Sequence, residues 1–285
     1  MTKRERAVWQ IRRYTSVPQS VIALVCAGLL LFACAQTPTP TIETIEFSIV
    51  SDATTAPLLD ELVSFYQDER PTITVNLTQA VNAERALEAM QSGSADLVSV
   101  SSLLDSAAAG QPFWNRTFAR DSIVIVAHPT NPVGELTLSQ LRSIFQGQVL
   151  KWTDLGGLDV DVVPVSREDG SGTRNGFEAL VMGRREVSPT AVVMPSQEAV
   201  VEYVSMTPGA IGYVSPAWLR PSVNLVGVEG TTPSPKAIEQ GTYVLARPFY
   251  FVARTAPTGG LAEFVDWVSA GNGQQLIARD YAPAP

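Results

Sequence analysis

The chain has 285 residues, of which 45% are hydrophobic and 17% charged, and its formal net charge is −8. This acidic balance argues against a nucleic-acid-binding protein, which needs a basic face. Its two cysteines, Cys26 and Cys34, exclude a cysteine-rich metal site and a scaffold held by several disulfides.

The N-terminus has the pattern of an export signal. Basic residues precede an apolar run over residues 21–32, which is shorter than the roughly 20 residues that a membrane-spanning helix needs. Small residues around a cysteine at the end of such a run resemble the bacterial lipobox. We therefore predict a signal peptide over residues 1–33, a diacylated Cys34, and a lipid-anchored linker over residues 34–43. The alternative is a signal-peptide cysteine without a role.

Strand and helix patterns alternate along the rest of the chain. The predicted strands cover residues 44–50, 73–77, 96–100, 122–127, 161–165, 210–214, 223–228 and 243–252. The predicted helices cover residues 58–66, 84–90, 138–145, 177–181, 200–204, 261–268 and 274–278. Thr137 with Gln140 has the pattern of a capping box, and Ser196 is a predicted N-cap. This alternation indicates an α/β fold with largely parallel sheets.

A hydroxyl-rich turn over residues 167–174 is the most informative motif for function. It reads Arg-Glu-Asp-Gly-Ser-Gly-Thr-Arg and precedes an amphipathic run. A helix that begins here would direct free N–H groups, two hydroxyls and its positive dipole end into one space, which suits a tetrahedral oxyanion. The alternative is ordinary turn and capping chemistry. Without residues 1–33 the net charge is −12, so such a site would need aimed local donors.

A second loop of this kind follows the first predicted strand. Thr54 and Thr55 stand just before Pro57, which suits the first turn of a helix. The chain therefore contains two strand, hydroxyl-loop and helix units, and each is a candidate for one half of an anion site.

Several segments, in order and spacing, resemble the PstS-like phosphate-binding lipoproteins of bacterial ABC importers, a group of type II periplasmic binding proteins. The similar segments are residues 52–58, 96–102, 131–133, 136–141, 144–147, 152–157, 167–173, 210–214 and 243–248. The resemblance covers nearly all of residues 45–280.

The resemblance implies an α/β two-lobe periplasmic-binding-protein fold with two mixed sheets joined by two hinge crossings. We expect the crossings near residues 122–127 and 244–253. Lobe 1 would comprise residues 44–122 and 246–285, and lobe 2 residues 123–245. Ligand would bind in a cleft between the lobes, at helix N-termini, and closure would bury it.

The resemblance also assigns roles to site residues. Hydroxyls and N–H groups at the two helix starts would grip phosphate oxygens from both lobes. Arg167 corresponds to a phosphate-facing arginine, and Asp169 to the acid that holds this arginine in place. The ligand-binding residues implied in this way are Thr54, Thr55, Ser101, Arg167, Asp169, Ser171, Gly172 and Thr173.

One departure from the family concerns selectivity. Many relatives carry Asp or Arg just after the third strand, where this chain has Ser101 or Ser102. A carboxylate acceptor pairs with the proton of hydrogen phosphate and disfavours sulfate, which has no proton. We expect Asp52 or Asp169 to supply that acceptor. The alternative role of Asp52 is to cap its own turn.

The resemblance implies an extracytoplasmic, lipid-anchored monomer that captures inorganic phosphate for an ABC permease, without a cofactor or metal. Alternatives are a binding protein for sulfate, molybdate or tungstate, a phosphate-sensing lipoprotein, and a serine-dependent phosphoesterase. An enzyme is disfavoured because Asp169 stands where a nucleophile elbow needs Gly. The single histidine, His128, is predicted to lie in a surface turn, away from Ser171.

Overall fold

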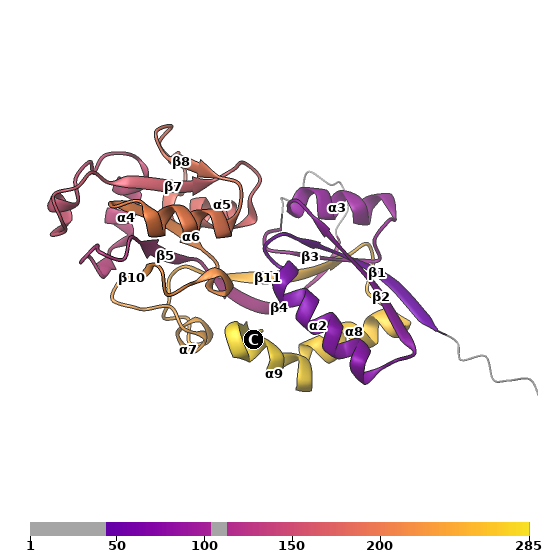
Figure 1. Ribbon diagram of the computed structural model, residues 1–285. Coiled ribbons are helices and arrows are strands. Elements are labelled where there is room, and N and C mark those ends of the chain that lie inside the picture. The colour runs from indigo at the N-terminus through magenta and orange to yellow at the C-terminus, as the bar shows by residue number, and fades with distance from the viewer. Residues whose placement is uncertain (1–43, 104–112, 285) are drawn as a thin grey trace, which may run out of the picture. The chain divides into compact units, whose positions relative to one another are not determined.

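The computed structural model describes residues 44–103 and 113–284 and contains two six-stranded mixed sheets (Figure 1). The first sheet has the order β12-β4-β11-β3-β1-β2 and the second the order β6-β10-β5-β9-β7-β8. The predicted α/β fold with two mixed sheets is therefore confirmed.

The first sheet combines early and late parts of the chain. Strand β1 pairs in parallel with β2 and β3, whereas β11 pairs antiparallel with β3 and β4, and β12 antiparallel with β4. The strands are β1 (Ile45–Asp52), β2 (Ile73–Ala80), β3 (Leu97–Val100), β4 (Trp114–Ser122), β11 (Ala246–Ala253) and β12 (Ala282–Pro283).

The second sheet is built from the middle of the chain. Strands β7 and β8 and strands β7 and β9 are parallel, while β5 is antiparallel to both β9 and β10. The strands are β5 (Val124–Ala127), β6 (Glu135–Leu136), β7 (Val163–Arg167), β8 (Val192–Met194), β9 (Ala210–Val214) and β10 (Asn224–Val228).

The chain passes between the sheets twice, and the two passages are hydrogen-bonded to each other. Ile123 separates β4 from β5, and its N–H donates to the carbonyl of Leu245, just before β11 (2.9 Å). The predicted single strand over residues 122–127 is thus the end of one strand and the start of another. Strand β4 was not predicted, because its sequence Trp-Asn-Arg-Thr-Phe-Ala-Arg-Asp-Ser mixes charged and apolar residues on both faces.

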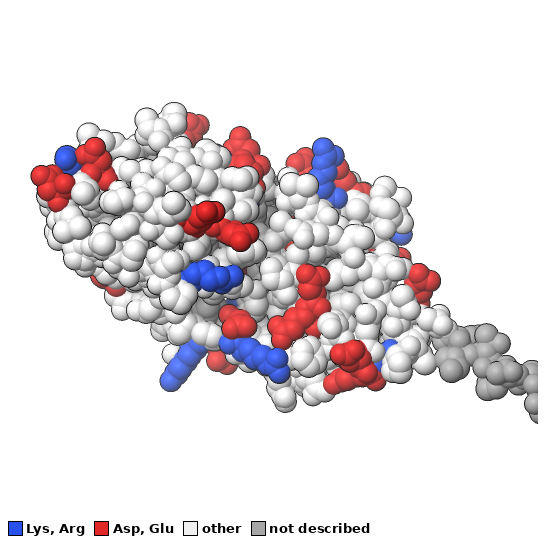
Figure 2. Space-filling model, in the orientation of Figure 1, with Lys and Arg blue, Asp and Glu red and all other residues white. Residues whose placement is uncertain are grey.

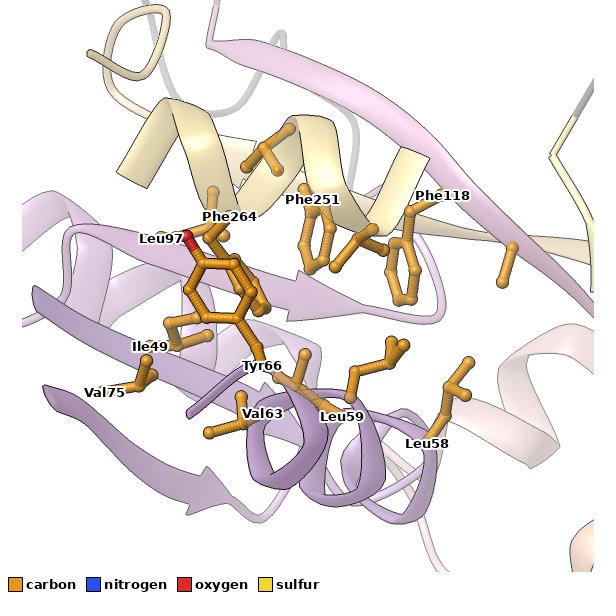
Figure 3. Packing of buried hydrophobic residues seen from close by; sticks show 14 of the residues in the cluster. Ile49, Leu58, Leu59, Val63, Tyr66, Val75, Leu97, Phe118, Phe251 and Phe264 are labelled. Atoms are coloured by element: carbon orange, nitrogen blue, oxygen red, sulfur yellow. The ribbon is translucent and has the colours of Figure 1, made fainter. Parts of the chain in front are cut away.

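Helices cover both faces of the first sheet. Helix α2 (Ala56–Glu69), with α8 (Gly259–Ser269) and α9 (Gly271–Asp280), packs on one face, and α3 (Ala83–Ser92) on the other. Figure 3 shows Tyr66 of α2 beside Phe264 of α8, with ring centroids 5.0 Å apart and the planes nearly perpendicular. Burial of such large rings supplies much of the stabilisation that holds α2 against this face of the sheet.

The second sheet is covered in the same way. Helices α4 (Leu138–Phe145) and α5 (Gly172–Phe177), with the π-helical turn Glu178–Met182, pack on one face, and α6 (Gln197–Met206) on the other. The predicted capping box of α4 is confirmed by reciprocal bonds between Thr137 and Gln140 of 3.1 and 2.8 Å. The Ser196 hydroxyl accepts from the amide of Ala199, as predicted for an N-cap.

One further α-helix is short. Helix α7 (Pro235–Glu239) precedes the second passage and packs against the core of the second sheet. Within residues 44–103 and 113–284, no helix combines the length and apolar character that crossing a membrane requires. The predicted signal peptide, Cys34 and linker lie outside the described residues.

Candidate ligand-binding site

The turn at residues 167–174 connects strand β7 to helix α5. Gly170 adopts a left-handed conformation with φ of 83°, which an L side chain would strain. Ser171 is the N-cap of α5, and its hydroxyl accepts from the amide of Arg174 at 3.4 Å. The helix begins at Gly172, as the sequence predicted, so its first amides remain without intrahelical partners.

This turn of the second sheet lies against residues of the first sheet. A Cβ placed on Gly172 would overlap the Ser101 hydroxyl and lie 2.8 Å from Thr54 Oγ1, and a Cβ on Gly170 would lie 2.8 Å from Asn82 Nδ2. Only glycine allows such close approach. The structure thus brings together Thr54 and Ser101 from one sheet and Gly172 from the other.

Asp52 organises the loop between β1 and α2. Its Oδ1 accepts from the amides of Thr54 (3.0 Å) and Thr55 (2.8 Å), while its Oδ2 accepts from the amide (2.8 Å) and hydroxyl (2.7 Å) of Ser101. The residue is only 1% exposed. Its carboxylate therefore caps its own turn, the alternative that the sequence left open, and ties that turn to the end of β3.

The predicted hydroxyl ligands differ in what they contact. The Thr55 hydroxyl donates to the Ser99 carbonyl at 3.0 Å, and its role as a ligand group stays a prediction. The hydroxyl proton of Thr55 satisfies the buried Ser99 carbonyl of strand β3. Within the described part of the chain, Thr173 Oγ1 is fully buried and has no hydrogen-bond partner. Its hydrogen-bonding capacity is therefore unused in this structure.

The predicted pairing of Arg167 with Asp169 is wrong. Arg167 Nε and Nη2 donate to the carboxylate of Glu168 at 2.9 and 2.7 Å and to the carbonyls of Met194 and Pro195 at the end of β8. Asp169 instead pairs with Arg174 at 2.6 Å, and its side chain is 93% exposed. Gly170 has a left-handed conformation and turns the chain just after Asp169. The Asp169 carboxylate therefore lies in solvent, and Arg167 pairs with Glu168 instead.

Arg174 braces the turn from inside α5. Its guanidinium donates to the Arg167 carbonyl at 2.9 Å and to Glu178 Oε1 at 2.8 Å. Burial lowers the pKa of Arg174, but hydrogen bonding and attraction from Glu178 and the charge of Asp169 outweigh that effect and raise it. The residue stays cationic and holds the turn in shape.

Sequence reasoning missed a buried polar network beside the turn. Arg247 on β11 donates through Nε and Nη2 to Asp121 Oδ2, and through Nη1 to the Gly172 carbonyl at 2.9 Å. Ser215, at the end of β9, bridges both charged residues. Desolvation raises the pKa of Asp121 despite the attraction of Arg247. The only signal of this network in the sequence was a charged residue, Arg247, within the largely apolar run over residues 243–252.

Tyr213 supports the strand that leads into the turn. Its hydroxyl bonds with Ser166 Oγ at 2.8 Å and accepts from the amide of Arg167, and its ring stacks on Phe177 with centroids 4.0 Å apart. Burial raises the pKa of Tyr213 to about 12. The tyrosine therefore stays neutral and fixes β7 relative to α5.

His128 is buried rather than in a surface turn, which corrects the prediction. Its Nδ1 lies 2.8 Å from the Thr130 hydroxyl, and the residue is 9% exposed. The amide of Thr130 also donates to Nδ1 at 3.2 Å, and the amide of Asn131 donates to the His128 carbonyl at 2.9 Å. Because its ring bonds to Thr130, His128 is part of its own turn and is not placed as a base for Ser171.

The surface charge agrees with an acidic protein. Figure 2 shows acidic and basic side chains interspersed over one face, where the coloured groups form no continuous basic field among the described residues. With a net charge of −8, an anion site on this chain would depend on local donors.

The comparison with known proteins places the chain in a family. A family model described as a PBP superfamily domain matches residues 35–271, and the chain belongs to this superfamily. It is similar to structures of an ABC-type phosphate transport receptor from Vibrio cholerae (29% identity, TM-score 0.72) and of a putative phosphate ABC transporter substrate-binding protein with bound phosphate from Clostridium perfringens (25% identity, TM-score 0.77). Each match covers 84% of this chain and 100% of the other.

The chain is also similar in sequence to curated proteins that are named as phosphate-binding proteins. The chain is 29% identical over 168 residues to the phosphate-binding protein PstS of Bacillus subtilis, a match that covers 58% of this chain and 56% of that protein. It is 28% identical over 268 residues to PstS of Pseudomonas aeruginosa, covering 84% and 83% of the two chains. The chain thus spans little more than half the length of the first of these relatives. Both relatives are named as binding proteins rather than enzymes.

Proposed function

We propose that the protein is an extracytoplasmic solute-binding protein that captures inorganic phosphate and delivers it to an ABC importer. The observation that carries the proposal is the convergence of Thr54, Ser101 and the Gly172 turn, beside the buried unpartnered hydroxyl of Thr173. Phosphate offers several oxygens to such donors, and unpaired helix amides favour its negative charge. The names of the relatives and the bound phosphate in one similar structure support the same ligand.

In this proposal the site draws on both sheets. Thr54 and Ser101 contribute from the first sheet, while Ser171, Gly172 and Thr173 contribute from the second. Asp169 is exposed and Arg167 is buried, and both act through the side chains with which they pair. The corresponding lobes are residues 44–122 with 246–285, and residues 123–245, and the order of the strands in the two sheets supports this division.

Thermal unfolding of the purified full chain with added anions tests the proposed ligand. A ligand that binds only the folded state raises the midpoint by an amount that depends on its concentration relative to Kd. We expect inorganic phosphate to raise the midpoint in a saturable way, with calorimetry giving one site per chain. Molybdate, tungstate and sulfate test the rival oxyanions. A midpoint that phosphate leaves unchanged would contradict the proposal.

We also propose that the protein is not an enzyme. The Ser171 hydroxyl accepts from a backbone amide as a helix cap, and His128 bonds to Thr130 within its own turn. A phosphate-ester assay of the full chain is therefore expected to show no turnover. Turnover that disappears in Ser171→Ala would establish the phosphoesterase alternative instead.

The anchor and the partner complete the proposal. Cys34 carries the lipid that tethers the chain outside the cytoplasmic membrane, and the protein works as a monomer with a membrane permease. Incorporation of labelled fatty acid into the chain, and its loss in Cys34→Ala, is the expected result. Incorporation that persists in the variant would contradict a lipid on Cys34.

A further inference from the structure

A cavity of about 470 Å³ lies beside the place where the chain passes between the sheets. Thr117 and Arg120 of β4 and Pro248 of β11 line it from the first sheet. Ile238 of α7 and Tyr243, which belong to the core of the second sheet, line it as well. Helix α7 contacts β4 here (Figure 1). A molecule in this cavity, which we call the hinge cavity, would contact residues of both sheets.

The hinge cavity is separate from the proposed phosphate site. Arg247 contributes to its lining, but the guanidinium of this residue is committed to Asp121 and to the Gly172 carbonyl. Successive residues of a strand point to opposite faces, so Arg120 and Asp121 lie on opposite faces of β4. No residue of the hydroxyl-rich turn at residues 167–174 lines the hinge cavity.

Arg120 is the cation of the hinge cavity that lacks an acidic partner. The ion pairs of β4 are those of Arg116 with Asp266 and of Asp121 with Arg247. Arg120 forms no ion pair with any residue in the ranges 44–103 and 113–284, although it is partly buried. Because a guanidinium presents parallel N–H donors that match the two oxygens of a carboxylate, this position suits a carboxylate ligand.

Most of the other side chains that line the hinge cavity are apolar. Ile238 and Tyr243 are each 2% exposed, and Val244 at the edge is 41% exposed. The Tyr243 hydroxyl donates to the Ile123 carbonyl at 2.8 Å, so this polar group already has a partner. Sites for small organic molecules have volumes of about 300–1,000 Å³, are mainly apolar with a few polar groups, and occur where domains meet. The hinge cavity has each of these properties.

We propose that the hinge cavity binds a small carboxylate with an apolar body, and that the carboxylate pairs with Arg120. The apolar body would pack against Ile238, Tyr243 and Val244. A phosphate dianion suits the cavity less well, because a buried charge needs more donors than one guanidinium and the Thr117 hydroxyl supply. This inference does not depend on the proposed function, since the two sites use different side chains.

Equilibrium dialysis of the purified full chain against cinnamate tests the inference. We expect saturable binding of one molecule per chain, with a Kd of about 1 mM or below. Arg120→Gln removes the charge and should weaken this binding about tenfold or more. Cinnamyl alcohol has the same apolar body without the charge, and it should also bind about tenfold more weakly. Inorganic phosphate should not displace cinnamate.

Two further variants provide a control and an independent test. Arg116→Gln removes another arginine of β4, one that pairs with Asp266 outside the cavity, and it should change cinnamate affinity by less than about twofold. Val244→Asp places a negative charge at the edge of the cavity and should weaken the binding by repulsion. Circular dichroism and the unfolding midpoint show that each variant is folded.

The outcomes separate this inference from the proposed function. Absence of saturable cinnamate binding up to about 10 mM would overturn the inference. Binding that Arg120→Gln leaves unchanged, or that phosphate displaces competitively, would locate the probe elsewhere and would overturn it as well. A chain that binds cinnamate through Arg120 and does not bind phosphate would contradict the proposed function alone.

Discussion

Arg247 and Asp121 form a buried ion pair directly across two neighbouring strands. They occupy paired positions of β11 and β4, and Asp121 Oδ2 accepts from Arg247 Nε at 3.0 Å and from Nη2 at 2.7 Å. Asp121 lies just before the first passage between the sheets and Arg247 just after the second, and Arg247 also bonds to the carbonyl of Gly172. One guanidinium therefore joins the first sheet to the turn that begins α5.

Removing one member of this pair should be strongly destabilising. Arg247→Met leaves the Asp121 carboxylate buried without a counter-charge, which costs about 3–5 kcal/mol when a buried pair is broken. Urea denaturation followed by circular dichroism measures the loss. As a control, Arg85→Met removes an ion pair with Glu88 in which both side chains are at least half exposed, and it should cost less than about 1 kcal/mol. Equal losses in the two variants would contradict the structural role of the Arg247 pair.

The close approach at Gly172 predicts a binding defect from a single methyl group. In Gly172→Ala the new Cβ would collide with the hydroxyls of Ser101 and Thr54, which pushes the two halves of the site apart. We expect phosphate affinity to fall at least about tenfold by calorimetry, a change of roughly 1.4 kcal/mol. Gly134→Ala is the matched control, because a Cβ there meets no atom within 4 Å. Unchanged affinity in Gly172→Ala would show that this contact does not belong to the binding site.

The Thr173 hydroxyl, which has no partner among residues 44–103 and 113–284, predicts opposite effects on stability and binding. Thr173→Val keeps the shape and removes a buried polar group without a partner, so the unfolding free energy without ligand should stay the same or rise by about 1 kcal/mol. Phosphate binding should weaken, because a donor is lost. Thr55→Val gives the contrast, since its hydroxyl bonds to the Ser99 carbonyl and its loss should destabilise the chain. A Thr173→Val protein that is less stable and binds phosphate normally would refute the assignment.

Much of the fold could be predicted because its determinants are local. The alternation in β1, the apolar stripe of α2 and the capping box at Thr137 each depend on residues within one or two turns. Strand β4 was missed because its pattern is irregular and its place in the sheet is fixed by β11, more than a hundred positions away in the sequence.

The site was predictable in part for the same reason. The two hydroxyl loops are continuous in sequence, and the structure brings Thr54, Ser101 and Gly172 together. The partner of Asp169 was predicted wrongly, because spacing alone does not show which way a side chain leaves a glycine turn. The ion pair of Arg247 and Asp121 joins residues 126 positions apart, and no local pattern reports such a contact.

Tyr213 predicts how stability changes in alkali. Burial raises its pKa to about 12 in the folded chain, above the ordinary tyrosine value of 10.0. Between these values Tyr213 in the folded chain keeps a proton that it has lost in the unfolded chain. Its contribution to stability is therefore fully present below about pH 10 and falls by roughly 2–3 kcal/mol as the pH rises toward about 12. Urea denaturation at several pH values measures this fall, and Tyr213→Phe should reduce it. The variant also loses the bond to Ser166, which adds an offset that does not change with pH and is measured at about pH 8. An alkaline loss of stability as large in Tyr213→Phe as in the unmodified chain would contradict the prediction.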